Sequence, residues 1–209
     1  MSTVDAIAPK LTQDQNEVLR EIVNIGMGQA GASLAAILQS FVELSIPQIV
    51  VARASELPAA LVQVLGKNAE VTAVRQAFFG HWHGEALAVY NEAGCKDLAD
   101  LMGYTNALEK DTEVELLLDV ANVVVGACLN GVAEQLGASI NFGPPSVFAH
   151  RVLASEVMDP KSLTWSHTLL MEVHFGLEHR RFRTHIVTMM SEDTIDTLCK
   201  DLDGFLERL

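Results

Sequence analysis

The stretch E-I-V-N-I-G-M-G-Q-A carries a carboxylate at Glu21, an amide at Asn24 and a glycine at Gly28. With about 100° of rotation per residue, these three residues and Glu17 fall on one narrow face of a helix. Carboxylates accept hydrogen bonds and pair with cations, whereas an amide both donates and accepts. We therefore expect an acid and an amide to project side by side into solvent, one turn apart, where another molecule can reach both.

The same pattern occurs a second time in the chain. The segment Asp14–Pro47 aligns without a gap with Thr112–Pro145. The residues of the second copy that match the four named above are Glu115, Asp119, Asn122 and Gly126. Because aspartate takes the place of glutamate, the acid of the pair is one methylene shorter in the second copy. The chain therefore has two related candidate sites.

The two glycines need an explanation, because glycine inside a helix costs about 1 kcal/mol relative to alanine. Gly28 and Gly126 can leave room for the backbone of a docked partner, or they can permit a close crossing of two helices. Asparagine is also a poor helix former and gains nothing on a solvated helix face. The recurrence of both features at the same spacing favours a surface that receives another protein.

The acids have simpler explanations that stay open at this point. Glu17 and Glu115 close the patterns D-Q-N-E and T-E-V-E, which are typical of capping boxes at helix N-termini. Glu21 and Asp119 can be ordinary acids of a solvated face. We nevertheless include all four in the candidate sites because each recurs at the same place in both copies.

The elements that position these residues also repeat, in units of about 12–104 and 110–209. Each unit begins with a long helix, roughly 14–40 and 112–138. The apolar face that each helix turns toward a sheet comprises Leu19, Ile22, Val23, Ala30, Leu34 and Ile37 in the first copy, and Leu117, Val120, Ala121 and Val132 in the second. A strand after a proline, a hairpin and a terminal helix then complete the unit.

The expected strands are 46–53, 71–79 and 85–90 in the first unit and 146–153, 167–175 and 182–189 in the second. A short helix is expected at 57–65, and terminal helices at 96–102 and 192–207. No linker rich in Gly, Ser or Pro separates the units. We predict an α/β (α+β) fold: one pseudo-two-fold domain with a six-stranded, mostly antiparallel sheet and the two long helices packed on it.

Composition narrows the class of partner. The formal net charge is -13, which argues against nucleic acid because phosphate backbones select clustered Lys and Arg.

The cysteines Cys95, Cys128 and Cys199 form no C-x-x-C pair, so we expect reduced thiols in a cytoplasmic protein. Residues 1–10 show no signal-peptide pattern, and the apolar window 116–125 is too short to span a bilayer. We expect no membrane association, and the sequence sets no oligomeric state.

The duplicated pattern acid-x3-acid-x2-Asn, followed at a distance by Pro, resembles the CheC/CheX/FliY family of chemotaxis phosphatases. It reads E-V-L-R-E-I-V-N before Pro47 and E-L-L-L-D-V-A-N before Pro145. The resemblance covers nearly the whole chain, because family members are also similar to a duplicated unit of a helix and three strands. It implies hydrolysis of the aspartyl phosphate on a CheY-like response regulator.

The resemblance also implies roles for the site residues. Asn24 and Asn122 would orient the attacking water, and Glu21 and Asp119 would pair with a lysine of the regulator. Mg²⁺ would belong to the bound regulator, and this chain would hold no metal of its own. The shorter Asp119 predicts a weaker second site. The alternative is a non-catalytic signalling adaptor that binds a regulator or another chemotaxis protein through the same helix faces.

Two further motifs were weighed. His81–His83, H-W-H, can bind a metal, although a strand end or turn is the favoured interpretation. His179–Arg183, H-R-R-F-R, is expected to be a hairpin tip with solvated charges.

Overall fold

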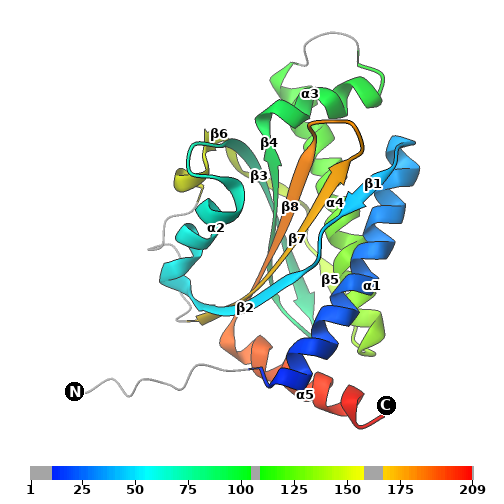
Figure 1. Ribbon diagram of the computed structural model, residues 1–209, viewed down its shortest axis with the longest axis vertical. Helices are drawn as coiled ribbons and strands as arrows, with labels where there is room; N and C mark the ends of the chain where they lie inside the picture. The colour runs from blue at the N-terminus through cyan, green and yellow to red at the C-terminus, as the bar shows by residue number, and fades with distance from the viewer. Residues whose placement is uncertain (1–10, 105–108, 158–166, 209) are drawn as a thin grey trace, which may run out of the picture.

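The computed structural model describes residues 11–104, 109–157 and 167–208 (Figure 1). The helices are α1 (Gln13–Leu38), α2 (Leu57–Leu65), α3 (Glu92–Leu101), α4 (Lys110–Gln135) and α5 (Glu192–Leu206). The strands are β1 (Val42–Leu44), β2 (Gln48–Arg53), β3 (Glu70–Gly80), β4 (Gly84–Asn91), β5 (Ile140–Phe142), β6 (Ser146–Leu153), β7 (His167–Leu177) and β8 (Arg183–Met190). The predicted mixed fold, with long helices on an antiparallel sheet, is confirmed. All six expected strands are present, and β1 and β5 are short strands that the sequence analysis did not predict.

The sheet joins the two halves of the chain by exchanging strands. Its order is β1-β7-β8-β4-β3-β5, with β2 also paired to β7 and β6 also paired to β3, and every pairing is antiparallel. The first strands of each half therefore pair with the hairpin of the other half, and the two hairpins meet at β4 and β8. The outer edge of the first hairpin, β3, therefore pairs with β5 and β6 of the second half, and the outer edge of the second hairpin, β7, pairs with β1 and β2 of the first half.

The two faces of the sheet are covered by different helices. Along β4, Ala86, Ala88 and Tyr90 belong to the core beneath α1 and α4, whereas Leu87 and Val89 belong to the core beneath α2. This alternation follows from the period of two in a strand. Figure 1 shows α2 on one side of the sheet and the long helices on the other.

The long helices cross each other closely at two glycines. A Cβ on Gly26 would lie 2.5 Å from the carbonyl oxygen of Cys128, and one on Gly131 would lie 2.7 Å from the Cα of Gly26. Real side chains do not tolerate such distances, so both positions require glycine for the backbones to approach. The close crossing considered for Gly28 and Gly126 is therefore made by two other glycines.

The apolar faces of the long helices lie where the sequence predicts, with one exception. Leu19, Ala30 and Leu34 have no exposed surface, and full burial of a leucine stabilises the fold by roughly 1.5–3 kcal/mol. Ile37, which was expected on the same face, is 41% exposed, so that prediction is wrong. It lies in the last turn of α1, two residues before the left-handed C-cap residue Gln39, whereas its neighbour Leu38 stays buried.

The predicted capping boxes are also wrong. The N-cap of α1 is Thr12, whose side chain accepts a hydrogen bond from the backbone of Gln15 while the Gln15 side chain accepts one from the Thr12 backbone. The N-cap of α4 is Glu109, which makes no side-chain capping bond. Both helices begin earlier than expected, and Glu17 and Glu115 consequently have no capping role.

Helices α1 and α4 are each long and apolar enough to cross a membrane by length and composition alone. Their most apolar windows are 44% and 61% buried within the fold. Burial of one apolar face against a sheet and a neighbouring helix is the pattern of core helices in a soluble protein.

Candidate functional site

The first candidate site lies on the outer face of α1. Glu17, Glu21, Asn24 and Gly28 are all exposed, because they lie on the side of the helix opposite its buried apolar face. A Cβ on Gly28 would meet nothing within 4 Å, so this position is open space. The Glu17 carboxylate accepts a hydrogen bond of 2.9 Å from the side chain of Gln13. Acid, amide and bare backbone thus follow one another along a single exposed stripe, which we call the α1 stripe.

The second candidate site, the α4 stripe, repeats the arrangement with one difference. Glu115, Asp119 and Asn122 are exposed, Gly126 is half-buried, and a Cβ on Gly126 would again meet nothing within 4 Å. The Oδ1 atom of Asn122, however, accepts a hydrogen bond of 2.8 Å from Nε2 of Gln76.

Gln76 is a residue of the second site that the sequence analysis missed. Its side chain is 1% exposed on β3, and its Nε2 also donates to the carbonyl oxygen of Gly143 at 3.1 Å. One face of the Asn122 amide is thereby tied to the sheet, whereas no hydrogen bond to the Asn24 side chain occurs within the described ranges. A glutamine in an apolar strand is the only sequence sign, and it does not reveal which helix the strand meets.

The H-W-H motif forms the turn between β3 and β4, as the favoured interpretation predicted. His81 Nε2 lies 2.9 Å from Oδ2 of Asp201, and the Trp82 indole nitrogen donates to the same oxygen at 2.8 Å. His83 contacts the hydroxyl of Thr194 at 3.1 Å. Both imidazoles therefore anchor α5 to the turn, and they do not converge on a common point.

The H-R-R-F-R motif is the expected hairpin tip between β7 and β8, and its charged side chains are exposed or partly exposed. The backbone N–H and guanidinium of Arg181 donate to the carboxylate of Asp97 at 2.7 and 2.9 Å. The hydrogen bonds from Arg181 hold the pKa of Asp97 below its usual value. Arg181 remains exposed, as expected, and its pairing with Asp97 joins the tip to α3.

A second group of polar residues lines a cavity of about 430 Å³ beside α2. His174 and His185 stand directly opposite each other on β7 and β8, with ring centroids 4.8 Å apart. His185 Nδ1 lies 2.9 Å from Oε1 of Glu172. Burial and the neighbouring His185 lower the pKa of His174, which favours its neutral form. These residues sit on the sheet face opposite the two stripes, and the sequence analysis did not single them out.

The fold defines the class of protein to which this chain is similar. No family model matches the sequence. Among solved structures, FliY from Thermotoga maritima has a TM-score of 0.72 and 18% identity over 93% of this chain and 98% of that chain. The chemotaxis protein CheX from Desulfovibrio desulfuricans has a TM-score of 0.53 and 15% identity over 80% of this chain and 99% of that chain.

The FliM middle domain from H. pylori is a further neighbour, with a TM-score of 0.62 and 11% identity over 91% of this chain and 99% of that chain. The chain therefore has the CheC/CheX/FliY-like fold, which chemotaxis proteins and FliM middle domains share.

Proposed function

We propose that the protein is a cytoplasmic phosphatase that hydrolyses the aspartyl phosphate of a CheY-like response regulator. The observation that carries the proposal is the α1 stripe, where exposed Asn24 stands one turn from exposed Glu21 beside the open backbone of Gly28. Asparagine and glycine both weaken an exposed helix, so a functional constraint accounts for them better than folding does. The partial repetition of the stripe on α4 supports the same interpretation.

The proposed chemistry needs little from this chain. Phosphoryl transfer depends mainly on positioning and on neutralising charge, and a regulator that brings its own Mg²⁺ supplies the neutralisation. The amide of Asn24 would enter the regulator's active site and orient the attacking water in line with phosphorus. The carboxylate of Glu21 would pair with a lysine of the regulator and set the docking pose. Gly28 would let the regulator's backbone approach the helix.

The two stripes are not equivalent, and we assign the greater activity to α1. Asp119 reaches one methylene less far than Glu21 toward a partner's lysine. The Oδ1 atom of Asn122 is already occupied by Gln76, so this amide must give up or share a hydrogen bond before it can turn fully toward a partner. The order of activity follows from these two differences.

Phosphate release from phosphorylated receiver domains tests the proposal. The wild-type protein should accelerate release over spontaneous decay, and Asn24→Ala should slow it by about a hundredfold, the order of loss expected when a reacting group is mispositioned. Asn122→Ala should have a smaller effect, and the double variant should leave spontaneous decay. Asn16→Ala is the matched control, because Asn16 is a partly exposed asparagine of α1 that lies about 80° around the helix from the α1 stripe. The proposed enzyme activity would be refuted if the wild-type protein accelerated phosphate release from none of the plausible regulators.

The second candidate function is a non-catalytic adaptor that binds a regulator or another chemotaxis protein. It is favoured by the likeness to FliM middle domains, which are found in complexes with FliG and with SpeE from H. pylori. Binding of a phosphorylated receiver without faster phosphate release would establish the adaptor. In that case Glu21→Lys should abolish binding, since reversal of the charge would repel the partner's lysine.

A further inference from the structure

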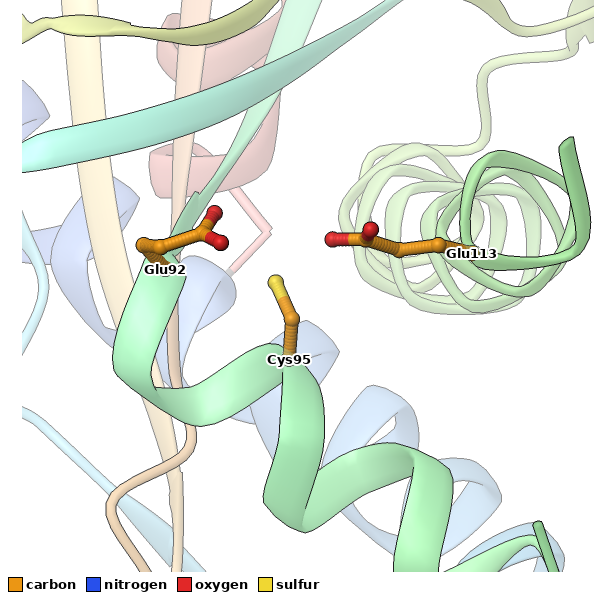
Figure 2. A group of neighbouring side chains, drawn as sticks. All are labelled: Glu92, Cys95 and Glu113. Carbon is orange, nitrogen blue, oxygen red and sulfur yellow. The ribbon is translucent and has the colours of Figure 1, made fainter. Parts of the chain in front are cut away.

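A group of metal-ligating side chains lies at the junction of α3 and α4, on neither stripe. Glu92 and Cys95 belong to the first turn of α3, and Glu113 belongs to the first turn of α4. One ligand atom from each residue lies within 4.8 Å of the other two. Figure 2 shows the two carboxylates facing each other with the thiol directed toward the space between them.

Arg151 already forms an ion pair with one oxygen of each carboxylate. Its Nη2 atom lies 2.9 Å from Oε2 of Glu113 and 3.0 Å from Oε1 of Glu92. The other oxygen of each carboxylate, Oε1 of Glu113 and Oε2 of Glu92, is buried and has no hydrogen-bond partner in the part of the chain that the structure describes. Glu113 is only 5% exposed. Leaving a buried charged oxygen without a partner is costly, so this site lacks a cation or a donor.

The charges of the group indicate what is missing. Two carboxylates face one guanidinium, which leaves an excess of one negative charge when the thiol is neutral. A divalent cation bound to the two carboxylates and to the thiolate of Cys95 makes the four side chains and the ion neutral together. Such compensation is what a buried charged cluster requires.

The donor set indicates which cation. A thiolate is a soft ligand that Mg²⁺ and Ca²⁺ avoid, whereas Zn²⁺ combines sulfur with carboxylate oxygen. In a tetrahedral zinc site the two oxygens and the sulfur stand about 3.4–3.6 Å apart, given bonds of about 2.1 Å to oxygen and about 2.3 Å to sulfur. Because the ligand atoms lie within 4.8 Å of one another, the three side chains must close by up to about 1.4 Å. Cys95 would release the weak hydrogen bond of 3.5 Å that its Sγ makes to the carbonyl oxygen of Asn91.

We propose that Glu92, Cys95 and Glu113 form a Zn²⁺ site that clips the start of α3 to the start of α4. A water molecule completes the coordination from the side of Glu92, whose side chain is 29% exposed. The segment that joins these two helices spans the boundary between the halves of the chain. The zinc ion therefore holds that boundary, independently of whatever the stripes bind.

Cobalt substitution tests the site in the full-length protein. Added Co²⁺ should produce a thiolate-to-cobalt charge-transfer band with one equivalent of metal, and Zn²⁺ should remove the band by competition. Cys95→Ser should abolish the band, and Glu113→Gln should weaken metal binding at least about tenfold in a competition with a chromophoric chelator. Cys199→Ser is the matched control, because Cys199 is a partly buried free thiol outside the group.

Thermal unfolding gives a second readout that does not depend on colour. Zn²⁺ should raise the melting temperature of the wild type and of Cys199→Ser, because a ligand that binds only the folded state stabilises it. It should leave Cys95→Ser unchanged, and circular dichroism would establish that this variant is folded. A wild type without a cobalt–thiolate band, or a band that survives Cys95→Ser, would overturn the proposal.

Discussion

Two glycines only two residues apart on α1 are expected to respond to the same substitution in opposite ways. Gly28→Ala adds a methyl group where a Cβ meets nothing within 4 Å. The variant should therefore gain the full helix-propensity difference of about 1 kcal/mol. For a chain of this length, such a gain corresponds to a rise in melting temperature of roughly 2–4 °C.

Gly26→Ala has the same propensity gain but no room for the methyl group. Its Cβ would lie 2.5 Å from the carbonyl oxygen of Cys128 and 3.2 Å from the backbone nitrogen of Val132. Since both obstacles are backbone atoms of α4, the helices must move apart, and overpacking of this kind costs about 1–3 kcal/mol or more. After the propensity gain of about 1 kcal/mol is counted, we expect a net loss that reaches about 2 kcal/mol at the upper end of this range.

Urea unfolding followed by circular dichroism measures both effects, with the wild type as the reference. A third variant, Gly28→Gln, introduces a good helix former whose side chain fills the space proposed for the partner. It should slow phosphate release about tenfold, equivalent to about 1.4 kcal/mol. A destabilised Gly28→Ala would show that this glycine serves packing and would refute the geometric reasoning. A stable Gly28→Gln with unchanged turnover would refute only the docking role.

Three further outcomes follow from the structure. Asp201→Ala leaves the buried Trp82 indole N–H without its acceptor, and urea unfolding should show a loss of about 1–3 kcal/mol; an unchanged midpoint would contradict this. Leu34→Ala removes a side chain with no exposed surface and should cost about 2–5 kcal/mol in the same assay, against little change for the exposed Ile37→Ala. The pKa of His174 is lowered in the folded state, so the unfolded chain binds a proton more readily, and stability should fall as pH falls below about 6.5. His174→Gln should flatten that slope, and an equally steep slope in the variant would assign the pH dependence to other groups.

The orientation of the long helices could be read from the sequence because it is a local property. The apolar residues of α1 and α4 recur with the helical period, and one buried stripe leaves the opposite stripe exposed. Glu21 and Asn24 are exposed for this reason, and the same holds for Asp119 and Asn122. The positions of the strands could also be predicted from the sequence, because alternating apolar and polar residues and flanking turn residues mark them locally.

The sequence predicted the first residue of each long helix less well than it predicted the buried face. The acidic patterns beginning at Asp14 and Thr112 satisfy the capping-box rule, yet α1 begins after Thr12 and α4 after Glu109. Several residues near a helix N-terminus can cap it, and the choice depends on where the preceding chain arrives. In α1 that choice is settled by Gln15, whose side chain also donates to Asp203 of α5.

The internal repeat and the helical period of the sequence alone predicted two copies of one unit, each with an acid, an amide and a glycine along one helix face, and the acids and amides are exposed there. Only the tertiary structure decided that Gly26 and Gly131 carry the helix crossing, which leaves Gly28 open. It also decided that Gln76 holds Asn122 and that Glu113 meets Cys95 across the boundary between the halves. The reason is physical: the face of a helix follows from residues within a few turns, whereas these contacts join residues far apart in the chain and exist only once the sheet has brought their elements together.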